Sequence, residues 1–252
     1  MRHVAITGAG NGLGKVCARR FGEAGDCIHV CDISPDSLTA LVAEKWVGTA
    51  ETVDVSNRNQ VNAFFDQILR RTDRIDVLVN NVGVAGHIAP VEEIPPDAWS
   101  ATLDANLNAG FWGIQRVLPH MKQAAGGVIL NVSTFSVRTV PQSRAPYIVA
   151  KAGLEALTRV VAREAGPWNI RCNAVRPGAM DNERLARVMS NLAERTGRTV
   201  ASVEAELLRY TSMRSKVSMD EVADLLYFLA SDAAAHITSQ IISVDAGAQW
   251  EE

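Results

Sequence analysis

The sequence predicts an α/β fold, a doubly wound parallel sheet of about seven strands with helices on both faces. Short apolar runs alternate with longer segments of helical spacing along the chain, which is the pattern of βαβ units. A glycine-rich turn directly follows the first apolar run. No linker or internal repeat interrupts the 252 residues, so we expect a single domain over residues 1–252.

The strands are placed on short apolar runs, and the helices on the longer segments between them. We predict strands near residues 3–7, 27–31, 50–54, 75–80, 127–132, 169–175 and 240–244. We predict helices near residues 12–24, 35–46, 57–71, 97–123, 145–166 and 218–231. Right-handed crossovers between successive strands then produce the doubly wound sheet.

Residues 179–217 depart from this alternation. The segment is polar, rich in Arg and Glu, and separates the sixth strand from the last helix and strand. A structureless loop of this length is uncommon inside a compact domain. We therefore expect two additional helices that form a lid over the substrate.

Composition excludes several classes of function. The net charge of -3 provides no basic stripe for a phosphate backbone, so no nucleic-acid partner is expected. No apolar stretch is long enough to cross a membrane and no signal peptide is recognisable, which predicts a cytoplasmic protein without a membrane partner. The four cysteines have no paired spacing and are expected to be reduced thiols. No cluster of His, Cys and carboxylate residues has metal-ligand spacing, so no metal site is expected.

The glycine-rich turn is the first candidate binding element. It runs from Thr7 to Gly14, between a strand and a helix, where glycines let the backbone approach a pyrophosphate at the helix N-terminus. In that context the turn predicts a nucleotide site rather than only a tight connection. The candidate contacts within it are Gly8, Asn11, Gly12, Leu13 and Gly14.

Asp32 ends the second strand, about 20 residues after the glycine turn, where a carboxylate can accept hydrogen bonds from both ribose hydroxyls of a dinucleotide. A 2′-phosphate would need a basic residue nearby, but Asp32 is followed by Ile33, and position 11 in the glycine turn is Asn11. The cofactor is therefore predicted to be NAD rather than NADP. The alternative is an ordinary acidic residue at a strand end.

Tyr147 and Lys151 lie four residues apart near the start of a predicted helix, hence on one face and one turn from each other. A neighbouring cation favours the phenolate and lowers the pKa of a tyrosine towards a range useful for proton transfer. Taken alone, the pair could equally be an exposed helix pair.

Beside these motifs stand Asp54-Val55, Asn80-Asn81-Val82-Gly83, Asn106, Asn131-Val132-Ser133-Thr134 and Pro177-Gly178. In this order, over essentially the whole chain, they resemble the short-chain dehydrogenase/reductase family. The resemblance implies a Rossmann-type fold and a homotetramer, with a dimer as the alternative.

The resemblance also implies roles for single residues. Tyr147 would be the general acid and base, and Lys151 would bind the nicotinamide ribose and lower the Tyr147 pKa. Asn106 would hold a water that relays protons from Lys151; its alternative role is bonding to the helix backbone. The remaining implied cofactor contacts are Asp54, Val55, Asn81, Gly83, Pro177, Gly178 and Met180.

Two positions depart from the family pattern. The catalytic serine expected thirteen residues before Tyr147 is Thr134, with Ser133 and Ser136 as alternatives. A threonine retains the hydroxyl but adds a methyl group and restricts χ1. Asn182 replaces the threonine that commonly bonds the nicotinamide carboxamide, and backbone groups near Gly178 and Met180 are the alternative.

The resulting functional prediction is an NAD-dependent oxidoreductase that interconverts a secondary alcohol and a ketone of a small molecule. Polyols, hydroxy acids and ring alcohols are the candidate substrates. Arg138 and Arg184 could pair with a substrate carboxylate, or be solvated surface arginines. The alternatives in function are a 3-oxoacyl-thioester reductase and a catalytically silent NAD-binding regulatory protein.

Overall fold

The computed structural model describes residues 1–248 and contains the predicted parallel sheet. Seven strands pair in the order β3-β2-β1-β4-β5-β6-β7, and every pairing is parallel. The strands are β1 (His3–Thr7), β2 (Cys27–Asp32), β3 (Val47–Thr52), β4 (Val77–Asn80), β5 (Gly127–Val132), β6 (Ile170–Pro177) and β7 (Ile241–Val244).

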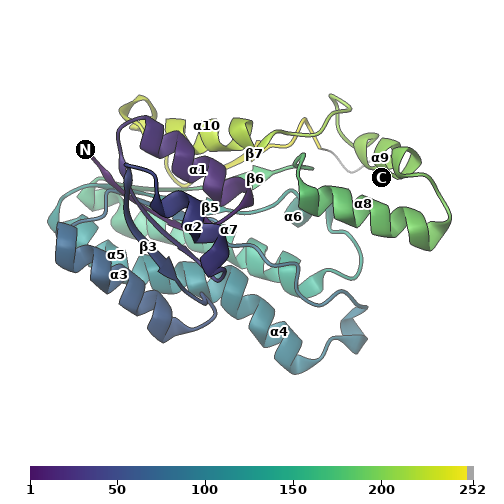
Figure 1. The fold of residues 1–252 in the computed structure, drawn as a ribbon, viewed down its shortest axis with the longest axis horizontal. Coiled ribbons are helices and arrows are strands. Elements are labelled where there is room, and N and C mark those ends of the chain that lie inside the picture. The colour runs from purple at the N-terminus through teal and green to yellow at the C-terminus, as the bar shows by residue number, and fades with distance from the viewer. Residues whose placement is uncertain (249–252) are drawn as a thin grey trace.

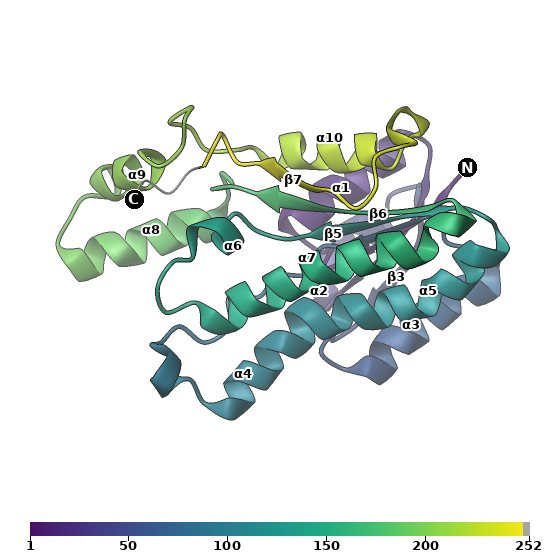
Figure 2. The same ribbon diagram turned by 180° about the vertical axis from the view of Figure 1, so that it is seen from behind.

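Helices cover both faces of this sheet, which gives the three layers visible in Figures 1 and 2. One face carries α1 (Gly12–Glu23), α2 (Pro35–Val42) and α10 (Met219–Leu229). The other carries α3 (Arg58–Thr72), α5 (Ala109–Gln123) and α7 (Ala145–Ala165). The remaining helices are η1 (Val91–Glu93), α4 (Pro96–Leu103), η2 (Asp104–Asn108), α6 (Ser136–Thr139), η3 (Gly166–Trp168), α8 (Glu183–Thr196), α9 (Val200–Leu208) and η4 (Asp232–Ala234).

The continuous apolar runs form strands because both faces of a parallel sheet are buried. In β1, Val4 and Ile6 belong to the core beneath α1 and α10, whereas Ala5 belongs to the core beneath α3 and α5. All four residues of β4 are buried. Successive side chains of one strand point to opposite faces of the sheet, so β1 contributes residues to two separate hydrophobic cores.

Several predicted boundaries differ from the structure. β3 spans Val47–Thr52 rather than residues 50–54, so Asp54 lies in the loop after the strand. The helix predicted over 97–123 is divided into α4, the π-helical turn η2 and α5. A π turn keeps the chain helical, and neither Pro nor Gly lies within η2 to mark it, so the sequence pattern predicted one helix.

Residues 179–217 contain two helices, α8 and α9, which pack on each other through Met189, Ala193 and Val203. The N-cap residues of the two helices are Asn182 and Thr199. Their side chains accept hydrogen bonds from backbone N–H groups of the first turn. This pair projects beyond the end of the sheet opposite the N-terminus (Figure 1). None of the helices within residues 1–248 is long and apolar enough to cross a membrane.

Candidate active site

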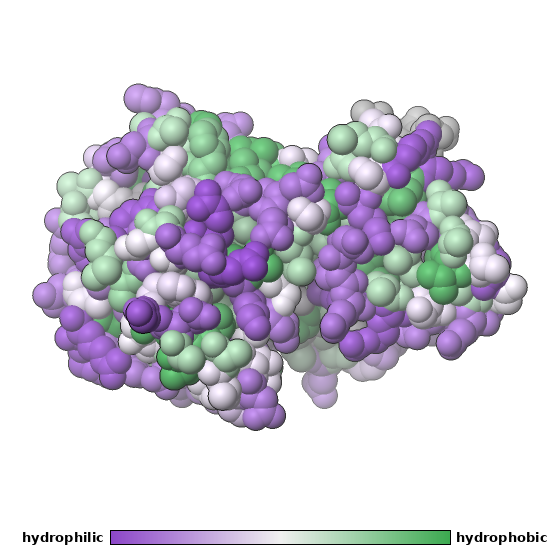
Figure 3. Space-filling view, turned by 45° about the horizontal axis from the view of Figure 1, so that its top comes forward, coloured by the Kyte–Doolittle hydropathy of each residue, from purple (hydrophilic) through white to green (hydrophobic). Residues whose placement is uncertain are grey.

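A cavity of about 1560 Å³ lies at the carboxyl ends of the strands, between the sheet and the α8–α9 pair. Figure 3 shows the hollow that separates this pair from the body of the molecule. The strand order reverses between β1 and β4, and ligands of doubly wound sheets bind at that switch point. Of the candidate residues from the sequence, Gly14, Asn106 and Arg138 do not line this cavity, and the others do.

The glycine turn forms one end of the cavity. Gly12 begins α1 with a φ of +53°, and a Cβ there would meet nothing within 4 Å, so the backbone is open to a ligand. Gly14 faces inward, because a Cβ at this position would lie 2.2 Å from the Gly8 carbonyl oxygen. The Asn81 amide holds the turn by donating to the carbonyls of Thr7 (3.1 Å) and Gly8 (2.9 Å).

Asp32 lines the cavity beside this turn. One carboxylate oxygen accepts a hydrogen bond from the Gly10 N–H at 2.9 Å and the other from the Ser34 N–H at 3.1 Å. No Lys or Arg of the described residues forms an ion pair with it. The carboxylate therefore both fixes the turn and leaves a negative charge at the cavity wall.

Tyr147 and Lys151 occupy the first turns of α7 and are both buried. The Lys151 ammonium donates to the carbonyl oxygens of Val82 and Val132, each at 2.8 Å. Its burial, with a smaller contribution from the positive charge of Arg184, lowers the pKa of Lys151 to about 7. No hydrogen bond joins the Tyr147 hydroxyl to another described residue, so the phenol is available to a ligand.

The three candidate hydroxyls, those of Ser133, Thr134 and Ser136, differ in their hydrogen bonds. Ser133 is buried and donates to a Glu155 carboxylate oxygen at 2.6 Å. Thr134 accepts a hydrogen bond from the Ser136 N–H at 3.2 Å, and its hydroxyl lies 3.3 Å from that of Ser136. The engagement of Ser133 favours Thr134, as the spacing predicts, while Ser136 stays beside it at the cavity wall.

Glu155 lies beneath this hydroxyl group and was not identified from the sequence. Its side chain is 4% exposed, and both carboxylate oxygens accept from the Arg176 guanidinium, at 2.7 and 2.6 Å. Arg176 belongs to β6 and Glu155 to α7, so the pair connects the helix that carries Tyr147 and Lys151 to the sheet. The sequence gives little indication of this ion pair, because it shows only one charged residue within each of two largely apolar segments.

Asn106 sits in the π turn η2 and is bonded entirely to backbone. Its amide nitrogen donates to the carbonyls of Thr102 (2.9 Å) and Val84 (3.2 Å), and its oxygen accepts from the Val84 N–H at 3.0 Å. This is the alternative role considered from the sequence. The side chain holds the loop after β4 against α4 and η2.

The carboxyl end of β6 supplies Pro177, Gly178, Met180 and Asn182 to the cavity wall. The Asn182 side-chain oxygen accepts from the Leu185 N–H at 2.9 Å and caps α8. This bond occupies one lone pair of the oxygen and fixes the side chain, and the amide nitrogen makes no hydrogen bond to a described residue.

The sequence suggested Arg138 and Arg184 as partners of a substrate carboxylate, but the structure places only Arg184 of these two at the cavity wall. Arg138 is half exposed, lies 4.0 Å from the Asp245 carboxylate and does not line the cavity. Arg144 lines it instead, with its guanidinium 4.9 Å from the centre of the Tyr147 ring. Burial lowers the pKa of Arg144, and the positive charge of Arg184 lowers it further. Arg184 donates to the Gly83 carbonyl at 3.0 Å.

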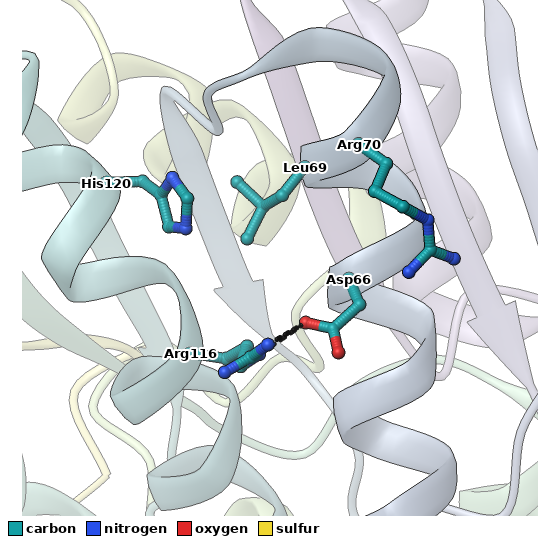
Figure 4. A pocket seen from close by; sticks show the side chains of 5 residues that line it. All are labelled: Asp66, Leu69, Arg70, Arg116 and His120. Atoms are coloured by element: carbon teal, nitrogen blue, oxygen red, sulfur yellow. Dashed lines mark hydrogen bonds and ion pairs between the residues drawn. The ribbon is translucent and has the colours of Figure 1, made fainter.

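A smaller pocket of about 290 Å³ lies between α3 and α5 and is lined by Asp66, Leu69, Arg70, Arg116 and His120 (Figure 4). Asp66 and Arg116 form an ion pair across it. None of the candidate site residues lies there, so it is separate from the site at the sheet edge.

The site fits a dinucleotide. The turn exposes backbone at Gly12 and at the helix N-terminus, Asp32 offers a carboxylate for a ribose, and the cavity reaches Tyr147 and Lys151. Asp54 and Val55, in the loop after β3, line the same wall.

Comparisons with known proteins give the same picture. A family model described as Enoyl-(Acyl carrier protein) reductase matches residues 8–249. The chain is 32% identical over 246 residues to the 3-oxoacyl-(acyl-carrier-protein) reductase FabG of Thermotoga maritima, covering 96% of this chain and 95% of the relative. A crystal structure of NAD⁺-bound xylitol dehydrogenase superposes with a TM-score of 0.90 at 28% identity, covering 98% of both chains. A structure of actinorhodin polyketide ketoreductase with NADPH also gives 0.90, at 26% identity, covering 98% of this chain and 96% of the other.

Proposed function

Because the chain belongs to the short-chain dehydrogenase/reductase family, whose members act on alcohols and ketones, we propose that it is an NAD-dependent dehydrogenase of a secondary alcohol. Tyr147 is the general acid and base, and Lys151 and Thr134 assist it. The observation that carries the proposal is the buried Lys151 ammonium, one helical turn from a Tyr147 hydroxyl that is free to meet a ligand at the cavity wall.

The residues present would divide the work as follows. The cofactor would be held by the glycine turn, Asp32, Asp54, Val55, Asn81 and the segment from Pro177 to Asn182, and when bound it would supply the hydride-transfer chemistry. Tyr147 takes the hydroxyl proton during oxidation and returns it during reduction. The Lys151 charge stabilises the phenolate, and the Thr134 hydroxyl donates to the substrate oxygen. The helices α8 and α9 act as a lid that keeps water from the reacting atoms.

The choice of NAD rests on Asp32. A carboxylate at this point of the cavity would repel a 2′-phosphate and bind both ribose hydroxyls, and no described cation pairs with it. Similar proteins have been solved with NAD⁺ and with NADPH, so membership of the family does not choose between the cofactors and the proposal depends on Asp32.

Replacing Asp32 should change the cofactor preference. Hydrogen bonds to a charged group contribute about 1.5–3 kcal/mol, so Asp32→Ala is expected to lower kcat/KM for NAD by about tenfold to a hundredfold or more. The rate with NADP should stay equal or rise, because the repulsion is gone. Initial rates of NADH and NADPH formation, for parent and variant, measure this.

Asp32→Asn is the matched control, because it keeps an oxygen that can accept from Gly10 N–H while removing the charge. If repulsion of the 2′-phosphate sets the preference for NAD, both Asp32→Asn and Asp32→Ala should lower the ratio of kcat/KM with NAD to kcat/KM with NADP by a similar factor. Equal kcat/KM for NAD and NADP in the parent protein would contradict the assignment of NAD.

The cavity also favours a substrate that carries an anionic group. Arg144 is half buried beside Tyr147, faces the positive charge of Arg184, and forms no ion pair with a described carboxylate. A carboxylate bound between the two guanidiniums would relieve this repulsion and could be held by bidentate hydrogen bonds. A hydroxy acid is therefore favoured among the substrate classes.

Arg144→Met should expose this preference. With hydroxy acids and their uncharged primary amides compared as paired substrates, the variant should lose about tenfold to a hundredfold in kcat/KM for the acid. The amide should be little affected, because it does not depend on the charge. Arg159→Met, on the exposed face of the same helix, is the control and should leave both rates unchanged. An amide oxidised as well as its acid by the parent would contradict an anion subsite.

A second function is favoured by the comparisons, reduction of a 3-oxoacyl thioester, since both the matched family model and the Thermotoga maritima relative carry acyl-carrier-protein names. Acetoacetyl thioesters assayed with NADH and NADPH distinguish it from alcohol oxidation. A thioester rate far above that for any secondary alcohol would favour the reductase.

A further inference from the structure

A second cluster of chemically active side chains lies at the amino ends of β1 and β2. His3 is the strand partner of Cys27, and His29 is the partner of Ala5, two residues further along. The three side chains share one face of the sheet because residues two apart in a strand point the same way. The N-terminus lies at the end of the molecule opposite α8 and α9, so the cluster is remote from the cavity (Figures 1 and 2).

We propose that His3, Cys27 and His29 form a binding site for a transition-metal ion of the zinc type. One nitrogen of each histidine and the Cys27 sulfur all lie within 4.8 Å of one another. The proposal departs from the expectation from the sequence that no metal site is present. The spacing of ligands along the chain is not that of a known motif, because strand pairing rather than a local turn brings them together.

The distances fit tetrahedral coordination. Zn–N bonds of about 2.05 Å and Zn–S bonds of about 2.3 Å place two nitrogens about 3.3 Å apart and a nitrogen and a sulfur about 3.6 Å apart. The His3 Nδ1 and His29 Nε2 atoms are 3.1 Å apart, and the Cys27 Sγ and His29 Nε2 atoms are 3.9 Å apart. These two pairs are within a few tenths of an ångström of the tetrahedral values, and the His3 nitrogen and Cys27 sulfur lie within 4.8 Å of each other. A movement of about 1 Å or less by the partly exposed His3 and Cys27 side chains would complete the geometry, with water as the fourth ligand.

The buried histidine is already oriented for this role. His29 is 2% exposed, and its Nδ1 lies 3.1 Å from the Thr49 hydroxyl on β3. When Nδ1–H donates to Thr49, the Nε2 lone pair points towards His3 and Cys27. Metal-binding histidines are commonly fixed by such a hydrogen bond from the other ring nitrogen.

Space for an ion is preserved by Gly48. A Cβ at this position would lie 2.6 Å from the Cys27 sulfur and 3.0 Å from His29 Cε1. The pairing of β2 with β3 shifts register between Ile28 and His29, which brings Gly48 next to the ligands. Any larger residue would press directly on two of them.

Without an ion, the His3 and His29 imidazoles share a hydrogen bond, which a metal ion must replace. Binding releases the thiol proton of Cys27 to solvent, and the proton that His3 Nδ1 shares with His29 moves to His3 Nε2, because the ligands are neutral imidazoles and a thiolate. Arg71 and Arg74 oppose a cation here, whereas Asp76 accepts from the His3 N–H at 2.6 Å and provides a nearby negative charge.

Cobalt(II) is a suitable probe, because it takes the coordination of zinc and absorbs visibly. The full-length protein, freed of metal by a chelator and kept anaerobic, is titrated with Co²⁺. We expect one equivalent to bind, with a thiolate-to-cobalt charge-transfer band and the intense visible bands of tetrahedral coordination, and Zn²⁺ to displace it. No stoichiometric binding, or binding without the thiolate band, would overturn the proposal.

The variants are chosen to fold. His3 and Cys27 are partly exposed, so His3→Gln and Cys27→Ser should retain the structure. Each should weaken Co²⁺ binding at least tenfold, and Cys27→Ser should abolish the charge-transfer band. Gly48→Ala keeps all three ligands and should weaken binding by crowding them. His236→Gln, an exposed histidine outside the cluster, should bind like the parent; binding unchanged in His3→Gln or Cys27→Ser would place the ion elsewhere and overturn the assignment.

Discussion

Tyr147→Phe should reduce kcat for oxidation of the best secondary alcohol by about a hundredfold to ten-thousandfold, the range that a positioned general acid and base contributes. The phenol is buried at the cavity wall and is not bonded to another described residue, so removing its oxygen deletes the proton acceptor without breaking a structural contact. The affinity for NADH, measured by fluorescence titration, should be nearly unchanged.

Two further variants show whether the loss comes from the hydroxyl group itself. Thr134→Ser keeps the hydroxyl and should retain most activity, whereas Thr134→Val, nearly the same size, should lower kcat with little effect on NADH binding. Turnover by Tyr147→Phe at the parent rate would refute the assignment. It would also mean that another group serves as the base. A parent protein without turnover on any secondary alcohol would instead favour the silent NAD-binding protein.

Glu155→Ala should lower the free energy of unfolding by about 3–5 kcal/mol, the usual cost of breaking a buried ion pair by removing one partner. The substitution leaves the Arg176 guanidinium, whose side chain is 18% exposed, without its bidentate partner, and it releases the Ser133 hydroxyl. Urea denaturation should show a lower midpoint with an unchanged m-value.

The matched controls distinguish burial from charge. Replacing both partners, Glu155→Leu with Arg176→Leu, should cost much less than the sum of the single substitutions, because no uncompensated charge stays buried. Asp224→Ala removes the partner of Arg20 at the surface, where the side chains are 62% and 39% exposed, and should cost less than about 1 kcal/mol. A loss below about 1 kcal/mol for Glu155→Ala would contradict a structural role for the buried pair.

Local patterns determined much of the molecule from the sequence alone. Apolar runs of strand length and longer helical segments predicted the parallel sheet and its seven strands, because burial on both faces requires continuous apolar strands. The glycine turn and the Tyr147–Lys151 pair were visible for a similar reason. Each lies within a few residues of chain, where backbone geometry fixes the relative positions.

Boundaries depended on more than the local pattern. The π turn around Asn106 keeps the chain helical and contains neither Pro nor Gly, so the segment looked like one continuous helix. β3 begins and ends earlier than predicted because its pairing with β2, including the register shift at Ile28, decides which residues are in the sheet.

The tertiary structure alone decided which distant residues meet. Arg144 rather than Arg138 reaches the cavity, Glu155 on α7 meets Arg176 on β6, and strand register joins His3 to Cys27. These contacts depend on crossovers and strand pairing, whose geometry is set by packing of the whole domain. The sequence by itself determined the sheet, the glycine turn and the Tyr/Lys pair, since local sterics and burial fix them. Long-range packing decided the remaining partners.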